Sequence, residues 1–206
     1  MKIKIAVIYL FVFSSFVYSQ SIKETFESGK KAFYSDKFDD ANNYFSQILS
    51  LESDSYDNCY YKGLVYEINF DNEKAIAELT NAISYKPKNS EAYYHKGKIY
   101  EKQEKYLDAI QDFTSALKYD KKNPDIYFER ASAYQEIKQY NEAIKDYSRV
   151  LKLNPNDDIT FYNRGLLYKE MKDNENAIED FESAIRIDKA WERELRPVIV
   201  QLQTGL

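Results

Sequence analysis

The sequence repeats itself every 34 residues, and this period constrains the fold more than any other feature. Four similar stretches mark the period: YYKGLVY at 60–66, YHKGKIY at 94–100, FERASAY at 128–134 and YNRGLLY at 162–168. A unit that starts at Ile22 gives five blocks without gaps, at 22–55, 56–89, 90–123, 124–157 and 158–191. A unit of this length holds two helices that cannot bury their apolar faces alone, so neighbouring units must stack.

Small and large residues alternate at fixed places of the block. The eighth place is small in every block: Gly29, Gly63, Gly97, Ala131 and Gly165. The twentieth place is alanine throughout: Ala41, Ala75, Ala109, Ala143 and Ala177. The twenty-fourth place is large: Phe45, Leu79, Phe113, Tyr147 and Phe181. We expect the small residues to let two antiparallel helices approach closely, while the large ones fill the space around the contact.

This pattern resembles that of the tetratricopeptide repeat (TPR) family, over 170 of the 206 residues. The resemblance implies an all-α fold, a right-handed α-solenoid of stacked antiparallel helix pairs called the TPR superhelix. The match is not perfect, because the first block has Ala32 where the others have tyrosine and the fourth has Ala131 where the others have glycine.

Residues 192–206 begin like a sixth unit and stop before a second helix. Leu195, Ile199 and Leu202 fall at core-facing places, which predicts a C-terminal capping helix over the fifth repeat. Pro197 removes a backbone donor, so we expect a kink near Arg193 or the start of a new helix.

Charged residues at two places of the block vary together. The seventh place is basic in the last four blocks: Lys62, Lys96, Arg130 and Arg164. The twenty-third place is acidic in the same four: Glu78, Asp112, Asp146 and Asp180. The first block has neither charge, with Ser28 and Tyr44. This predicts an ion pair inside each of the last four repeats, since a half-buried charge is costly without a partner. The alternative is a set of independent, solvated charges.

Helix starts are marked by cap residues. Ser21 and Glu24 have the spacing of a capping box, which predicts the start of the first helix. Asn123 precedes Pro124 as a cap before a first-turn proline. Asp71 and Asp173 are the predicted caps of two second helices.

The N-terminal segment 1–19 has the layout of a secretory signal peptide. Lys2 and Lys4 precede an apolar run from Ile5 to about Tyr18, and the small residues Val17 and Ser19 favour a cut after Ser19. An uncleaved anchor is the alternative, although the run is short for a membrane span. The expected location is outside the cytoplasm, periplasmic or extracellular, with no membrane embedding once the signal is removed.

The charge balance argues against several partners. After removal of 1–19 the chain carries 27 basic and 34 acidic residues, a net charge of −7. Nucleic acids and anionic membrane surfaces both require clustered bases, so neither is an expected partner.

The sequence offers no constellation for catalysis. His95 and Cys59 are the only histidine and the only cysteine, and a whole repeat separates them. A catalytic triad or a zinc site needs more groups than these. We therefore expect no enzyme activity, no metal and no cofactor. Cys59 occupies a core-facing place and is expected to be a small buried residue, a reactive thiol being the alternative.

Binding is the better hypothesis, because TPR stacks generally bind peptide segments in a groove lined by first helices. The resemblance places nine candidate groove residues at the fifth and ninth places: Phe26, Lys30, Tyr60, Leu64, Tyr94, Lys98, Phe128, Tyr162 and Leu166. Acidic residues at the second and twelfth places would form a margin: Asp57, Glu67, Glu91, Glu101 and Asp125. Such a groove suits an extended segment with apolar anchors and some lysine or arginine. Alternatively, the fifth-place aromatic residues simply brace adjacent helices.

Two functions follow from these observations. The first is an exported scaffold or adaptor that binds a protein or peptide partner in its concave groove. The alternative is a structural component of an envelope assembly that interacts through its ends or its convex face. A hydrophilic C-terminal cap would favour the first, and an exposed apolar end the second.

Overall fold

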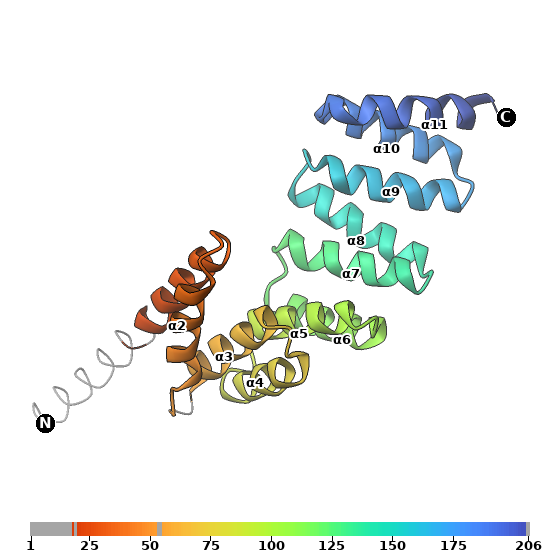
Figure 1. Ribbon diagram of the computed structural model, residues 1–206. Helices are drawn as coiled ribbons and strands as arrows, with labels where there is room; N and C mark the ends of the chain where they lie inside the picture. The colour runs from red at the N-terminus through yellow and green to blue at the C-terminus, as the bar shows by residue number, and fades with distance from the viewer. Residues whose placement is uncertain (1–17, 19, 53–54, 205–206) are drawn as a thin grey trace, which may run out of the picture. The chain divides into compact units, whose positions relative to one another are not determined.

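A computed structural model describes residues 18, 20–52 and 55–204, and this part of the chain is helical with no strand (Figure 1). Residues 20–33 form the first described helical stretch. The helices that follow are α2 (Phe38–Leu49), α3 (Tyr56–Ile68), α4 (Asn72–Tyr85), α5 (Ser90–Lys102), α6 (Tyr106–Tyr119), α7 (Pro124–Glu136), α8 (Tyr140–Leu153), α9 (Asp158–Glu170), α10 (Asn174–Ile187), the short 3₁₀ helix η1 (Lys189–Trp191) and α11 (Glu192–Thr204). None of the described helices combines the length and the apolar character that a membrane crossing requires. The predicted signal peptide lies almost wholly outside the described residues.

The chain divides into two compact units, Met1–Ile99 and Tyr100–Leu206, with the boundary inside α5. In the first unit α3 packs closely on α4, and α2 packs on α3. In the second unit α7 packs on α8 and α9 packs on α10, and α11 follows on α10 (Figure 1). The predicted class, all-α with consecutive antiparallel helix pairs, is confirmed.

The eighth-place glycines allow the close approach that the sequence predicts. A Cβ atom added to Gly165 would lie 2.7 Å from Cε1 of Phe181, and one added to Gly63 would lie 2.8 Å from Cγ of Leu79. These distances are shorter than carbon atoms tolerate, so only the hydrogen of glycine fits against the large side chain at the twenty-fourth place.

The first helix of each repeat ends in the same turn, which the sequence analysis does not predict. The fifteenth place adopts a left-handed backbone in every repeat, with φ between 58° and 61°: Asp36, Phe70, Glu104, Lys138 and Lys172. In the fourth repeat the Lys138 N–H donates to the Gln135 carbonyl and the Gln139 N–H donates to the Tyr134 carbonyl, both at 2.9 Å. These two bonds form the Schellman motif, which satisfies carbonyls at a helix end and usually has glycine at the left-handed position.

Three predicted caps are confirmed and one is wrong. Asp71, Asn123 and Asp173 accept backbone N–H groups at the starts of α4, α7 and α10. The capping box at Ser21 is contradicted, because Tyr18 and Gln20 are already helical. Ser21 lies within the helix, and its carbonyl accepts a hydrogen bond from the Thr25 hydroxyl.

The C-terminal helix α11 packs as expected. Leu195 and Ile199 are buried in a cluster with Phe181 and Ile185 of α10, and Leu202 is partly buried against it. Pro197 starts no new helix, because α11 runs through it from Glu192 to Thr204.

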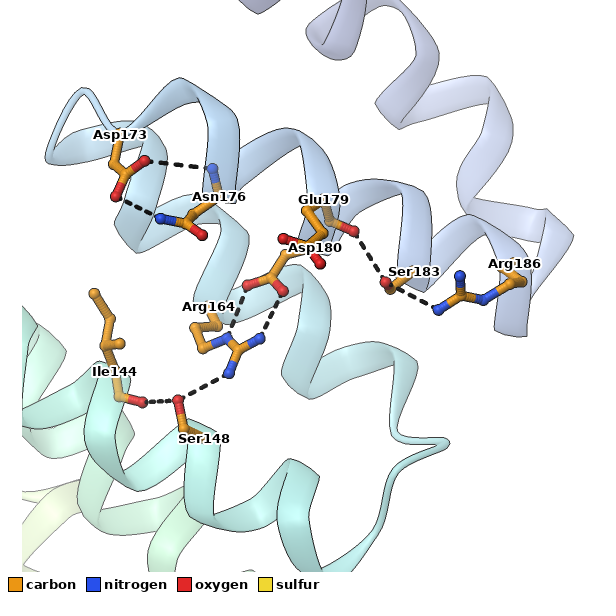
Figure 2. A network of polar contacts seen from close by, with 9 residues as sticks. All are labelled: Ile144, Ser148, Arg164, Asp173, Asn176, Glu179, Asp180, Ser183 and Arg186. Atoms are coloured by element: carbon orange, nitrogen blue, oxygen red, sulfur yellow. Dashed lines mark hydrogen bonds and ion pairs between the residues drawn. The ribbon is translucent and has the colours of Figure 1, made fainter.

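Two of the predicted ion pairs are confirmed in the second unit. The Arg164 Nε and Nη2 atoms bind the Asp180 carboxylate at 2.8 and 2.7 Å, and Nη1 reaches the Ser148 hydroxyl of the preceding repeat at 2.8 Å (Figure 2). Arg130 repeats this arrangement with Asp146 and Thr114. Each arginine therefore joins both helices of its own repeat and the repeat before it.

The pair of Lys62 with Glu78 is wrong. The Lys62 ammonium donates instead to the Leu51 carbonyl, just past the end of α2, and among the described side chains no ion pair joins it to Glu78. A carbonyl at a helix C-terminus attracts a cation, and a lysine lacks the forked head that lets arginine hold two partners. Lys96 and Asp112 belong to different compact units, so their pair stays a prediction.

Candidate functional site

In each of the two units, the first-helix face, which we define as places two, five, six, nine, twelve and thirteen of each repeat, is a candidate binding surface. The predicted residues on it differ in exposure. Phe26, Tyr60 and Leu64 are buried. The other six are half-buried: Lys30, Tyr94, Lys98, Phe128, Tyr162 and Leu166. Whether any of them binds a ligand stays a prediction.

The ring contacts indicate that some of the fifth-place aromatic residues brace adjacent helices. Phe26 lies 6.2 Å from Phe45 of its own repeat, between ring centroids, and 5.3 Å from Tyr61 of the next. Phe128 meets Tyr147 edge to face at 5.5 Å. Phe26 and Phe128 thus pack against the large twenty-fourth-place side chains of their own repeats. Among the fifth-place rings, only the half-buried ones keep surface for a partner.

Tyr60 and Tyr61 of this face form a cluster with Tyr56, which lies one helical turn before Tyr60 on α3. Tyr56 and Tyr60 stack with their centroids 5.4 Å apart and their planes 10° apart, and Tyr60 meets Tyr61 edge to face at 5.2 Å. Tyr60 also meets the ring of His95, from α5, at 5.9 Å. The stacked and edge contacts hold these rings in fixed positions.

Acidic side chains surround the tyrosine cluster. Burial, and after it the nearby Glu91 carboxylate, raises the pKa of Tyr61 to about 12. The same two causes raise the pKa values of Tyr56 and Tyr60 further above the ordinary range. One carboxylate thus raises the pKa values of all three hydroxyl groups.

A second acidic group, Glu67 of α3, is paired. Its carboxylate lies 2.9 Å from Nδ1 of His95 and 3.9 Å from Nζ of Lys98, and its side chain is only 10% exposed. The sole histidine therefore fastens α5 to α3 across the candidate surface. The described residues hold no group of three potential metal ligands, and Cys59 is buried.

In the second unit, part of the first-helix face is covered by the chain itself. The Tyr162 ring stacks on Trp191 with a centroid distance of 4.4 Å, and its hydroxyl donates to Glu194 of α11 at 3.1 Å. The Trp191 Nε1–H donates to Asp158 at 2.7 Å. Sequence reasoning missed Trp191, and the one signal for it was that it is the only tryptophan in the chain.

The repeats match models of known families. The tetratricopeptide repeat model matches residues 90–123, 124–157 and 159–189, and the TPR repeat model matches 71–104. Together with the helix pairs described above, these matches show that the chain belongs to the tetratricopeptide repeat family. No curated protein sequence matches it.

Solved TPR structures resemble most of the chain. A crystal structure of MamA aligns with a TM-score of 0.69 at 19% identity, over 80% of this chain and 96% of that one. YrrB, described as a TPR protein with an unusual peptide-binding site, aligns with a TM-score of 0.64 at 20% identity, over 84% and 92%. A tetratricopeptide repeat protein from Parabacteroides merdae ATCC 43184 aligns with a TM-score of 0.68 at 26% identity, over 73% and 60%. These likenesses support the fold, and the fold supports a scaffold for protein interaction.

Proposed function

We propose that the protein is an exported, non-enzymatic TPR adaptor that binds an extended segment of a partner protein on its first-helix face. The observation that carries the proposal is the gathering of aromatic rings and carboxylates on α3 and α5, where Tyr61 and Tyr94 are half-buried and Glu91 is exposed. Fixed aromatic rings contribute large contact areas at little entropic cost, which is what a peptide-binding surface needs. The peptide-binding site in the printed description of YrrB is consistent with this use of the fold.

The outer surface of α11 favours an adaptor over a stacking component. Its exposed side chains include Arg193, Glu194, Arg196 and Gln201, with Val200 as the large apolar exception. A polar outer side keeps the end of a repeat array soluble and discourages end-to-end association.

Export rests on the sequence of residues 1–19. Intact mass of the protein recovered from outside the cytoplasm should correspond to a chain that begins at Gln20. A full-length chain retained in the membrane fraction would contradict cleavage.

Photocrosslinking tests the binding surface. A photoreactive amino acid replaces Glu91 on α5 or Asp125 on α7, and matched variants carry it at the exposed Thr80 on α4 or Asn141 on α8. We expect adducts with one partner from the two first-helix positions and few from the two second-helix positions. Equal adducts from both sets, or adducts from the second helices alone, would contradict the proposal.

A further inference from the structure

One carboxylate at the tyrosine cluster has no base beside it. Glu91 is exposed in the first turn of α5, and among the described residues no lysine, arginine or histidine lies within ion-pair distance of its side chain. The other acids of this surface differ, because Asp57 lies 3.9 Å from Lys86 and Glu67 is held by His95 and Lys98. Glu91 is therefore the acid available to an incoming cation.

A buried polar atom adjoins the same carboxylate. Tyr56 is 5% exposed, and its hydroxyl has no hydrogen-bond partner among the described residues. After burial itself, the charge of Glu91 and a contact between its side chain and the Tyr56 hydroxyl raise the pKa of Tyr56. This contact falls outside the geometry of a formed hydrogen bond, so the hydroxyl is at most weakly satisfied. A buried hydroxyl without a good hydrogen bond is costly. A bound donor that brings the Tyr56 hydroxyl and the Glu91 carboxylate together would therefore bind favourably.

The chain's own Lys86 shows how this surface holds an ammonium group. Its Nζ atom lies 4.3 Å from the centre of the Tyr56 ring and 3.9 Å from the Asp57 carboxylate. A cation over an electron-rich ring with a carboxylate beside it is a favourable arrangement. Tyr61 and Glu91 offer the same two components, and the Tyr61 ring is only half-buried.

We propose that Tyr61 and Glu91, backed by Tyr56 and Tyr60, bind a lysine or arginine side chain of the partner segment. This inference rests on the proposed function, since it names the chemistry that the first-helix face selects. An anionic side chain would be repelled by Glu91. A neutral apolar side chain would leave the carboxylate dehydrated without a partner.

Matched peptides test the preference. The probe is a short, extended, fluorescein-labelled peptide with leucine anchors and one central lysine. Companion peptides carry arginine, acetyl-lysine or glutamate at that position. Fluorescence polarisation should show that the lysine and arginine peptides bind at least about tenfold more tightly than the other two. The difference should shrink as salt is added, because screening weakens exposed charge pairs.

Two variants locate the site. Glu91→Gln should weaken binding of the lysine peptide by about threefold to tenfold and leave the acetyl-lysine peptide unaffected. Glu73→Gln is the control, because Glu73 is also an exposed first-turn acid, but on the second helix α4. Equal losses in both variants would show a diffuse effect of net charge and overturn the inference.

A lysine peptide that binds no better than the acetyl-lysine peptide would also overturn it. The proposed function has a separate outcome, because partner crosslinks from the position of Asp125 leave Glu91 in place and do not depend on this preference.

Discussion

Arg164 and Lys62 occupy the same place of the repeat but satisfy their charges in different ways. The Arg164–Asp180 pair is nearly buried, with side chains 18% and 4% exposed. Burial disfavours the arginine cation, but the hydrogen bonds and charge of Asp180 outweigh burial and raise the pKa of Arg164. Burial also raises the pKa of Asp180, against the opposing effect of Arg164. The forked contact geometry indicates that both groups are ionised.

Removing the arginine should therefore cost more than removing the lysine. Arg164→Met leaves Asp180 buried without its base and should lower the free energy of unfolding by about 3 kcal/mol or more. Lys62→Met loses one hydrogen bond to a carbonyl and should cost about 1 kcal/mol. Urea denaturation measures both, and Arg164→Met/Asp180→Leu should recover most of the loss. If the change in the free energy of unfolding of the double variant equalled the sum of the two single changes, Arg164 and Asp180 would not be a coupled pair.

Tyr61 should make the stability depend on alkaline pH. Its pKa is about 12 in the folded protein against 10.0 for a free tyrosine, so the folded state binds more protons between these values. Stability should therefore be intact below pH 10 and fall as the pH rises toward 12. Tyr61→Phe should show a shallower fall, while Tyr34→Phe, at a tyrosine that is 76% exposed, should match the parent. Identical curves for the parent and Tyr61→Phe would contradict this assignment.

At the scale of the element, the turn between the two helices of each repeat carries conformational strain. Lys138 has φ of 60°, and side chains other than glycine pay an energetic penalty in this region. Lys138→Gly should raise the free energy of unfolding by about 0.5–1 kcal/mol.

A second lysine-to-glycine substitution in the same repeat provides the control. Lys152 lies in the last turn of α8, so Lys152→Gly should lower the free energy of unfolding by about 1 kcal/mol. Urea denaturation measures the free energy of unfolding of both variants. Changes of the same sign in the two variants would contradict strain at Lys138.

At the scale of the whole molecule, stability should spread through neighbouring repeats. Leu195 is 1% exposed against α10, so Leu195→Ala should cost about 2–5 kcal/mol locally. In a repeat array this loss should speed hydrogen exchange in α9 and α10 more than in α3 and α4. Val200→Ala, on the same helix but at a residue 54% exposed, should change little. Uniform faster exchange along the chain would contradict a nearest-neighbour array.

The sequence predicts those features that recur with the period and depend on side-chain size. Gly165 against Phe181 follows from the eighth and twenty-fourth places, and Arg164 with Asp180 follows from charges that vary together. Features that depend on the backbone or on a single site were missed. Phe70 occupies a left-handed position where glycine is the usual signal, and hydrogen bonds of the turn override its local preference.

The candidate site was predicted less well than the fold. The fifth-place aromatic residues were expected to share one role, but Phe26 and Tyr60 are buried whereas Tyr94 is half-buried. Exposure depends on which side chain of the next repeat packs against each ring, and Tyr61 and His95 fall at a place of the repeat where residue type varies.

The most direct test of the first-helix face as a binding surface compares partner affinity with folding stability on one variant. Tyr94→Leu trims a half-buried ring of α5, and Tyr44→Leu trims a ring on the second helix α2 as the control. For the partner captured by crosslinking, Tyr94→Leu should weaken affinity at least about tenfold and leave the denaturation midpoint near that of Tyr44→Leu. An unchanged affinity together with a large fall in the midpoint would assign Tyr94 to bracing and contradict the binding face.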